Sequence, residues 1–349
     1  MIIVLIKLVS NSFLDMKSFF RVLITLSLSL TPVLGLTSSA EAALLVGSLD
    51  NGDVLSFDDT TGEFISIFAK GLPGMTFGEG PTSITFGPDS NLYVGMNTGV
   101  ILRYDGSTGT FIDTFASVDS SQSLITSITF GADKNLYVTD FFNVRVVRFN
   151  GTTGAFIDNF VPTGSGGLNG PTGLTFGPDG NLYVGSRITN QVLRYNSSTG
   201  AFINVFATGG NNGPQQLVFG SDNNLYVAVD GAGGNGQVLR FNGQTGSFID
   251  TFASNIPSTT DSMSLTFGPD ENLYVTSQFE NSVLRFNGTS GTFIDTFVSS
   301  GSGGLSFPTN LLFQKKSIPK PVPEATTTLG LLVLGAFGVS SSMKRFKAF

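Results

Sequence analysis

The stretch "FGPDGNLYV" at 176–184 recurs along the chain in nearly identical form, and this recurrence decides the fold. A catalytic motif is usually needed once in a chain, whereas a building unit is needed many times. The phenylalanines that open the copies, together with Phe313 of "PTNLLF", are spaced 44, 46, 43, 48 and 46 residues apart. A period in the forties with four short apolar segments is typical of β-propeller blades. The other copies are "FGPDSNLYV" (86–94), "FGADKNLYV" (130–138), "FGSDNNLYV" (219–227) and "FGPDENLYV" (267–275).

One unit shows the four strands of a blade, which we call a to d. They are "TGLTF" (172–176), "NLYVGS" (181–186), "QVLRYN" (191–196) and "AFINVF" (201–206), each alternating or running apolar over a few residues. The repeated phrase is then the turn from strand a to strand b. Proline presets φ, aspartate bonds its own backbone, and the following Gly or Asn tolerates positive φ. The rival interpretation, a calcium loop, lacks the further ligands at alternate positions that such loops need.

The register of the repeat is offset at the two ends. After residue 42 the chain begins with "ALLVGS" (43–48), which matches strand b rather than strand a. The missing strand a is "TNLLF" (309–313) at the far end of the repeat. We therefore expect an all-β, six-bladed β-propeller over 43–314, with four-stranded antiparallel blades and an N-terminal blade completed by the C-terminal strand. Such closure leaves no open blade edge between the ends.

Strands c and d carry a regular charge pair. An arginine and an aspartate lie ten residues apart in most units, so a c–d hairpin would place them opposite each other. An exposed pair of this kind contributes only about 0.2–1 kcal/mol. The first unit has Ser56 and Ser66 at these positions, and the fourth has Arg194 and Asn204. The expected pairs are Arg103–Asp113, Arg148–Asp158, Arg240–Asp250 and Arg285–Asp295.

Phenylalanine recurs in three columns, one in strand a and two in strand d. We expect all of these positions to contribute to a core that contains no Trp and no disulfide. A fully buried ring contributes about 1.5–3 kcal/mol. An aromatic binding stripe is the alternative. The first column is Phe86, Phe130, Phe176, Phe219, Phe267 and Phe313; the second is Phe64, Phe111, Phe156, Phe202, Phe248 and Phe293; the third is Phe68, Phe115, Phe160, Phe206, Phe252 and Phe297.

Composition excludes several kinds of chemistry. The 349 residues include no His and no Cys, which rules out a Ser-His-Asp triad, a histidine-ligated metal, a thiolate metal site and a disulfide framework. The net charge of −7 argues against binding to nucleic acid.

The first 42 residues predict a signal peptide that forms a short hydrophobic helix and is removed by signal peptidase. Lys17 and Arg21 precede the apolar run 22–36, and Ala40 and Ala42 frame an A-x-A cleavage site. Both Met1 and Met16 are candidate starts, because "MKSFFRVLITLSLSL" alone has the usual layout. The alternative is an N-terminal membrane anchor.

The C-terminus has three parts: a proline-rich linker at 315–324, a 19-residue run without charge from Ala325 to Met343, and a basic end. As a helix the run spans roughly 28 Å, enough for a transmembrane segment. The basic residues fit the cytoplasmic side of a membrane. The alternative is a plain C-terminal anchor. The short motif Val322, Pro323 and Glu324 ends the linker, and the basic residues after the uncharged run are Lys344, Arg345 and Lys347.

This order of motif, apolar helix and basic end resembles the PEP-CTERM sorting signal of Gram-negative bacteria, although Ala325 replaces the usual second proline. The resemblance assigns residues 325–349 to a sorting tail and implies processing by exosortase. It also implies export to the outer surface or extracellular matrix, with transient insertion in the inner membrane.

Comparison among units indicates which face of the propeller recognises a ligand. The a–b and c–d turns are nearly uniform, whereas the b–c and d–a loops vary and lie on the opposite face. Variable loops on a rigid scaffold usually carry recognition. Their carboxylates either hold Ca²⁺, the one candidate cofactor, or are solvated loop charges. The candidate ligand-binding residues are Asp50, Asn97, Asp119, Asp140, Asn143, Arg187, Asp230, Asp261 and Glu280.

The units resemble NHL-type repeats and, more loosely, the streptogramin-lyase and gluconolactonase-like propellers. "GPTGLTFGPDGNLYVGSRITNQVLRY" (170–195) and "DFFNVRVVRF" (140–149) carry this likeness, which covers 43–314. The lyase uses histidine as its base, so its activity does not transfer to a chain without histidine. Gluconolactonase-like enzymes use a metal held by Glu, Asn and Asp, a chemistry that the composition permits.

Two hypotheses follow. The first is an exported, non-catalytic propeller that binds or scaffolds, with an exopolysaccharide or a surface protein as partner. The alternative is a Ca²⁺-dependent, gluconolactonase-like hydrolase. The strand-a residues expected nearest the axis carry no charge, which favours the first hypothesis: they are Ser83, Ser127, Gly173, Gln216, Ser264 and Asn310.

Overall fold

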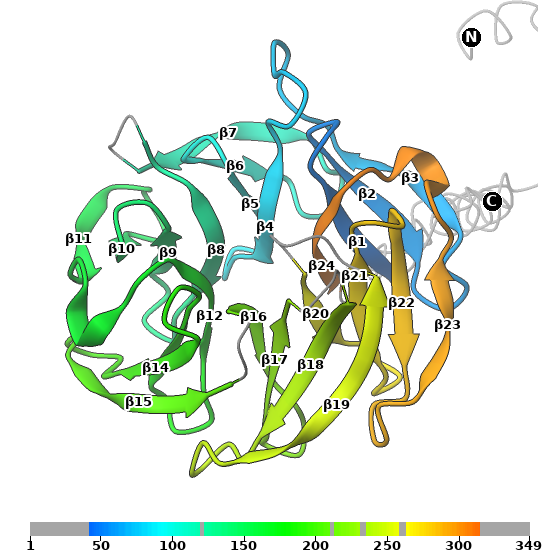
Figure 1. Ribbon diagram of the computed structural model, residues 1–349. Helices are drawn as coiled ribbons and strands as arrows, with labels where there is room; N and C mark the ends of the chain where they lie inside the picture. Colours follow the sequence, from blue (N-terminus) through cyan, green and yellow to red (C-terminus); the bar gives the residue numbers. More distant parts are fainter. Residues whose placement is uncertain (1–41, 119–121, 210–212, 231–234, 258–262, 315–349) are drawn as a thin grey trace, which may run out of the picture. The chain divides into compact units, whose positions relative to one another are not determined.

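The computed structural model describes residues 42–118, 122–209, 213–230, 235–257 and 263–314. These residues form six four-stranded antiparallel sheets arranged as blades around a central axis, as predicted (Figure 1). The predicted terminal helices lie outside the described residues. Within the described part of the chain, no helix is long and apolar enough to cross a membrane.

The blades follow one another in sequence order, and the first strand named in each blade lies nearest the axis. Blade 1 contains β24 (Pro308–Gln314), β1 (Ala43–Ser48), β2 (Asp53–Asp58) and β3 (Phe64–Ala69). Blade 2 contains β4 (Pro81–Phe86), β5 (Leu92–Met96), β6 (Val100–Tyr104) and β7 (Phe111–Ser117). Blade 3 contains β8 (Ile125–Phe130), β9 (Leu136–Asp140), β10 (Arg145–Phe149) and β11 (Phe156–Val161).

The second half of the ring repeats this order. Blade 4 contains β12 (Pro171–Phe176), β13 (Leu182–Ser186), β14 (Gln191–Tyr195) and β15 (Phe202–Thr208). Blade 5 contains β16 (Pro214–Phe219), β17 (Leu225–Val229), β18 (Asn235–Phe241) and β19 (Phe248–Pro257). Blade 6 contains β20 (Leu265–Phe267), β21 (Leu273–Ser277), β22 (Ser282–Phe286) and β23 (Phe293–Val298). Two short 3₁₀ turns, η1 (Ser165–Gly167) and η2 (Ser302–Gly304), precede blades 4 and 1.

The two ends of the repeat meet in blade 1, which confirms the predicted offset. Strand β24 pairs antiparallel with β1, and Leu44 lies opposite Phe313 in this ladder. The inner strand of blade 1 is thus supplied by the far end of the repeat, and it packs beside the inner strands of blades 2 and 6. The ring is therefore closed between its first and last blades.

The repeated phrase forms the a–b turn through a compact hydrogen-bond network. In blade 4, the Asp179 carboxylate accepts hydrogen bonds from the backbone N–H of Asn181 at 3.0 Å, from its side-chain amide at 2.8 Å and from the Tyr183 hydroxyl at 3.0 Å. Gly180 has φ +77°, as predicted for this turn. Ser90, Lys134 and Glu271 also adopt positive φ at this position, a wider range of residues than predicted. The network around the aspartate holds the turn even where the residue itself disfavours it.

A buried tyrosine joins each of blades 2–6 to the next. The Tyr183 ring packs edge-on against Phe206 of its own blade, with centroids 4.8 Å apart, and against Phe219 of the next blade at 5.1 Å. Burial raises the pKa of Tyr183 to about 12, so its hydroxyl remains a donor to Asp179. Blade 1 has Leu45 at this position, within the cluster that contains Phe86 of blade 2. Edge-to-face aromatic pairs contribute about 0.5–1.5 kcal/mol beyond area burial.

The predicted cross-strand pairs are confirmed in all four units. Arg148, for example, binds Asp158 through Nε at 3.1 Å and through the second guanidinium nitrogen at 2.5 Å. The guanidinium also stacks over Phe160, 4.8 Å from the ring centroid. In blade 4, Arg194 Nε donates to the side-chain amide oxygen of Asn204 at 3.0 Å.

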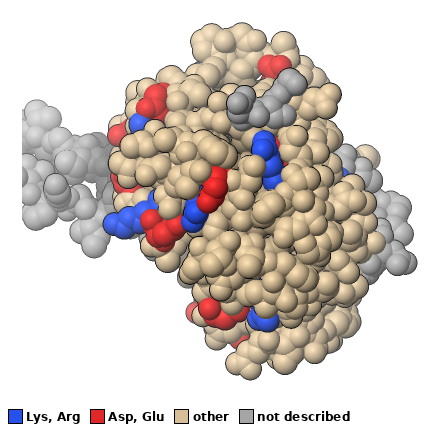
Figure 2. Space-filling view, turned by 90° about the vertical axis from the view of Figure 1, so that its left-hand side faces the viewer, with Lys and Arg blue, Asp and Glu red and all other residues tan. Residues whose placement is uncertain are grey.

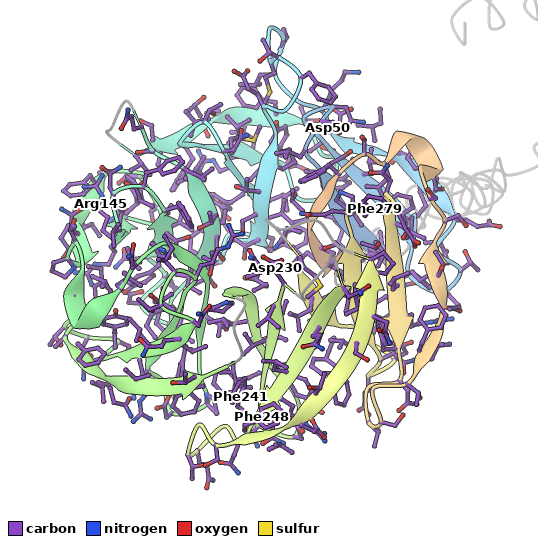
Figure 3. The ribbon with its side chains drawn as sticks, viewed as in Figure 1. Asp50, Arg145, Asp230, Phe241, Phe248 and Phe279 are labelled. Atoms are coloured by element: carbon purple, nitrogen blue, oxygen red, sulfur yellow. The ribbon has the colours of Figure 1, made fainter. Side chains whose placement is uncertain are left out.

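The prediction that every phenylalanine column is core is wrong for the second column. Phe156, Phe248 and Phe293 are 56–58% exposed. They begin the outer strand of each blade, where no further strand covers them, and they pack only edge-on against an aromatic ring of strand c, as Phe248 does on Phe241 (Figure 3). The third column is buried in blades 2–6, with Phe160 only 4% exposed, and Phe68 of blade 1 is partly buried.

We expect the two strand-d columns to differ sharply in their effect on stability. Phe160→Ala should lower the free energy of unfolding by about 3–5 kcal/mol, because it leaves a cavity between blades. Phe156→Ala should cost about 1 kcal/mol, because most of that ring already contacts water. Chemical denaturation followed by circular dichroism measures both. Equal losses would contradict the assignment of the second column to the surface.

A pH effect should arise at the c–d turns. Backbone N–H groups of Thr61 and Thr108 hold the pKa of Asp58 and Asp105, respectively, below the ordinary value. Their ionisation therefore stabilises the fold above the ordinary aspartate pKa of about 3.9. This contribution is lost as the pH falls through the lowered folded-state pKa. The other four blades have asparagine at this position, making the same hydrogen bonds: Asn150, Asn196, Asn242 and Asn287.

We therefore expect Asp58→Asn/Asp105→Asn to unfold within about 0.5 kcal/mol of the parent at pH 7. Between pH 7 and pH 3 it should lose less stability than the parent, because two groups that favour the folded state only when ionised have been removed. Denaturant titrations at both pH values provide the comparison. An unchanged or larger acid effect would show that these two carboxylates do not contribute in this way.

Candidate functional site

A cavity of about 420 Å³ opens at the axis on the face formed by the b–c and d–a loops. This is the face whose loops vary among the units. Small-molecule sites typically occupy roughly 300–1,000 Å³. The cavity walls come from the first residues of the inner strands and from the loops above them. We call it the mouth cavity.

A belt of threonines forms part of its wall and joins neighbouring blades. The Thr309 hydroxyl donates to the Pro81 carbonyl oxygen at 2.6 Å, and Thr82, Thr126 and Thr172 make the equivalent bond to the next blade at 2.7–2.9 Å. Because these protons are engaged, the threonines present mainly methyl groups and acceptor lone pairs to the cavity. In blades 1–4 the belt is therefore structural.

The repeat breaks at blades 5 and 6, where Gln215 and Met263 occupy the threonine position. The adjoining position breaks as well, because blade 4 has Gly173 and blade 5 has Gln216. A Cβ on Gly173 would lie 2.4 Å from the Gln216 side-chain oxygen, so the missing side chain makes room for this amide. Departures from an otherwise consistent pattern are expected at functional sites.

The broken belt surrounds an ion pair. The Asp230 carboxylate accepts a hydrogen bond from the Gln215 amide at 2.8 Å and pairs with the Arg187 guanidinium at 3.3 Å. Arg187 comes from the b–c loop of blade 4, and Asp230 follows strand β17 of blade 5. Figure 3 shows Asp230 close to the centre of the disc. Among the described residues that line the mouth cavity, Arg187 is the one charged side chain.

Apolar side chains complete the rim. Phe141 and Phe142 come from the b–c loop of blade 3, and Phe307 comes from the d–a loop before blade 1. Phe142 is 62% exposed, so an aromatic face is open to a ligand entering from solvent. The mouth cavity therefore combines neutral amides and hydroxyls with flat apolar surfaces.

The structure places the predicted binding residues unevenly. Asn97 and Arg187 line the mouth cavity, and Asp230 is held in its wall by Arg187 and Gln215. The Asn97 side chain accepts from the backbone of Gly80 at 3.1 Å and fixes the loop before blade 2. Asn97 is therefore partly a structural residue.

The remaining predicted residues are not brought together at the cavity. Asp140 is fully buried and is held by Asn143 at 2.9 Å and by Arg145 at 3.0 Å. Asp50 accepts a hydrogen bond from Ser306 at 2.8 Å. Glu280 is exposed on the b–c loop of blade 6. Asp119 and Asp261 lie outside the described residues.

In the described part of the chain, no group of three acidic side chains gathers in the arrangement that a metal ion would need. The carboxylates of Asp140 and Asp230 are already engaged with arginines. The described loops therefore do not form the cage of converging carboxylates that the calcium hypothesis anticipates.

Some lining residues were not among the predicted binding residues. Gln216, Ser264 and Asn310 were expected near the axis and do line the mouth cavity. Ser83 and Ser127 instead lie between blades, where their hydroxyls accept backbone N–H groups of the next blade. Phe141, Phe142 and Phe307 were missed because a search for charged loop residues ignores aromatic ones. A comparison of the positions that follow strand b would have drawn attention to Phe142 and to Phe279 at the same position of blade 6.

By sequence, no protein-family model matches the chain, and the search of curated proteins found no match. By structure, it is similar to a protein of unknown function from Bacteroides caccae, with a TM-score of 0.61 and 12% identity over 79% of this chain and 99% of the other. It is also similar to a chain of a nidogen/laminin complex, with a TM-score of 0.57 and 17% identity over 78% and 98%.

A third similar structure is the periplasmic gluconolactonase PpgL of Pseudomonas aeruginosa, with a TM-score of 0.52 and 17% identity over 79% of this chain and 99% of that one. At such identities the likeness establishes the fold alone, since propellers host unrelated functions. The protein is a six-bladed β-propeller whose neighbours include both an enzyme and a chain from a binding complex.

Proposed function

We propose that the protein is an exported, non-catalytic binding module that holds a neutral, polyhydroxylated ligand, such as the end of a surface polysaccharide, in the mouth cavity. The observation that carries this proposal is the composition of the cavity. Its described polar groups are amides, hydroxyls and one internally compensated ion pair. No described side chain there is a free carboxylate or imidazole that would act as a general acid or base.

The chemistry of the lining fits a sugar ring. Planar polar groups such as the Arg187 guanidinium and the Gln216 amide can each engage two adjacent hydroxyls, because their donors and acceptors are fixed in one plane. Phe142 and Phe307 offer flat faces to the C–H side of a ring. Since Asp230 compensates Arg187, the cavity carries no uncompensated charge among its described residues, and a neutral ligand is favoured over an ionic one.

The two described ends of the chain lie together at one face of the disc. Ala43 and Gln314 are paired at one end of blade 1, and the Gln314 amide donates to the Gly106 carbonyl oxygen of a c–d turn at 2.7 Å. The chain thus leaves the disc on the face opposite the mouth cavity. Attachment of this face to a surface would leave the mouth cavity open to the surroundings.

The alternative, a calcium-dependent lactonase, gains no specific support from the described residues. The similarity of this chain to PpgL concerns the fold alone. The described loops do not bring three carboxylates together at a possible metal site. Binding is therefore the function that the geometry favours.

Ligand binding should depend on the mouth cavity and not on exposed aromatics in general. A glycan array of neutral and uronate-containing oligosaccharides, probed with the full chain in mild detergent, should identify neutral ligands. Phe142→Ala and Gln216→Ala should each weaken binding of the best glycan about five- to tenfold in calorimetry, equivalent to about 1 kcal/mol.

Phe279→Ala is the matched control, because Phe279 holds the same b–c loop position in blade 6 and is 74% exposed but does not line the cavity. It should leave affinity unchanged. Binding of no glycan, or equal weakening by Phe279→Ala, would refute the proposal.

The export route predicts a second result. In a Gram-negative host that contains exosortase, the mature protein should lack the tail that follows Glu324, because the sorting signal directs its removal. Pro323→Ala/Glu324→Ala should retain the tail, and intact-mass spectrometry of membrane and surface fractions distinguishes the two forms. Pro319→Ala, in the same linker but outside the motif, should be processed normally. Retention of the tail by the parent chain would contradict this route.

A further inference from the structure

Two of the six outer strands differ from the other four in the same respect, because they lack a charged residue. In β3 and β15 the middle of the strand reads "FISIF" (64–68) and "FINVF" (202–206), without charge. Ile65 and Ile67 are 45% and 44% exposed, and Ile203 and Val205 are 41% and 40% exposed. Because side chains alternate along a strand, each pair forms one apolar face on an unpaired edge. We call these the two uncharged edges.

The other four outer strands carry charged side chains that disfavour pairing with another strand, and β3 and β15 lack these charges. Each has an exposed aspartate in the centre, held by an arginine, followed by Thr or Asn: Asp113, Asp158, Asp250 and Asp295. Charges on an edge strand oppose pairing with another edge. Figure 2, a view onto the rim at the left of Figure 1, shows charged side chains in small mixed clusters separated by uncharged surface.

The two uncharged edges lie on opposite sides of the ring. Blades 1 and 4 are separated by two blades in either direction, and Figure 1 shows β3 and β15 across the disc from each other. The likeness extends to the preceding loops, "TGSGGL" (163–168) and "SGSGGL" (300–305), which form η1 and η2. In each loop a glycine packs closely against the first phenylalanine of the edge strand, Phe202 or Phe64. These features therefore recur in blades 1 and 4, on opposite sides of the ring.

We propose that the uncharged edges of blades 1 and 4 bind a second copy of this chain, so that discs join side by side into rows. A second copy is the occupant because it offers the same uncharged ladder of unpaired N–H and C=O groups. The remaining four edges resist such pairing, since two of them brought together would oppose aspartate to aspartate. Two sites on opposite sides of a disc generate a row rather than a closed pair. Confinement of many copies to one surface would raise their effective concentration and favour this contact.

Crosslinking provides a direct test, because the chain contains no cysteine. Ile65→Cys/Ile203→Cys places a thiol on each uncharged edge of the full chain. Treatment with a flexible bis-maleimide in mild detergent should give a ladder of multimers on a denaturing gel. Ile112→Cys/Ile249→Cys is the matched control, because these residues hold the same position in the opposed blades 2 and 5 and are 44% and 42% exposed. It should give at least tenfold less multimer.

A second pair of variants removes the contact. Ile67→Asp/Val205→Asp, made in the Ile65→Cys/Ile203→Cys chain, should abolish the ladder. Thr114→Asp/Thr251→Asp, at the same exposed position of blades 2 and 5, should leave it intact. All four proteins should retain the same thermal midpoint, since every changed side chain is exposed. Equal ladders from the two cysteine pairs, or a ladder that survives Ile67→Asp/Val205→Asp, would overturn the proposal.

Discussion

Each blade depends on its neighbours because it cannot bury its own faces. The central contact is the tyrosine of strand b, which packs between a phenylalanine of its own blade and one of the next, while its hydroxyl fixes the a–b turn. One side chain thus links local turn geometry to the packing between blades. A chain of such contacts is complete only when the last blade meets the first. The pairing of β24 with β1 provides this closure, so packing between blades continues around the whole ring.

Regularity and function occupy different positions in this ring. Where the repeat is strict, its residues satisfy one another, as the threonine belt does by donating to the carbonyl of the next blade. Where the repeat is interrupted, side chains and strand edges can contact a ligand or another chain. Gly173, Gln215 and Gln216 interrupt the belt, and the Gln215 amide donates to Asp230 of the Arg187–Asp230 pair, whereas the outer strands of blades 1 and 4 lose their charges. The first break lies in the wall of the mouth cavity, and the second leaves edges that another sheet can extend.

The sequence predicted the fold well because its signals are local and repeated. The a–b turn, the offset of blade 1 and the Arg–Asp pairs each follow from spacing alone, and the structure has all three. The second phenylalanine column was misjudged because spacing cannot tell the covered part of an edge strand from its open part. The site was harder to predict, since the prediction treated charge in variable loops as the sign of recognition. Asp140 and Asp230 instead pair with arginines, while the uncharged Phe142 and Gln216 line the cavity.

Pairing of arginine with aspartate occurs both at the mouth cavity and on the outer strands of the ring. Within the described ring, every arginine pairs with an aspartate, so the guanidinium groups lie in small mixed clusters (Figure 2). At the mouth cavity the charges compensate each other, and on the two uncharged edges they are absent, so recognition at these places must come from shape, hydrogen bonds and apolar contact. That condition suits a ligand rich in hydroxyl groups at the mouth and an identical edge at the rim. A row of discs with the mouth cavities on one face would present many binding sites together. Such an arrangement would raise the avidity for a polymer that repeats the same ligand.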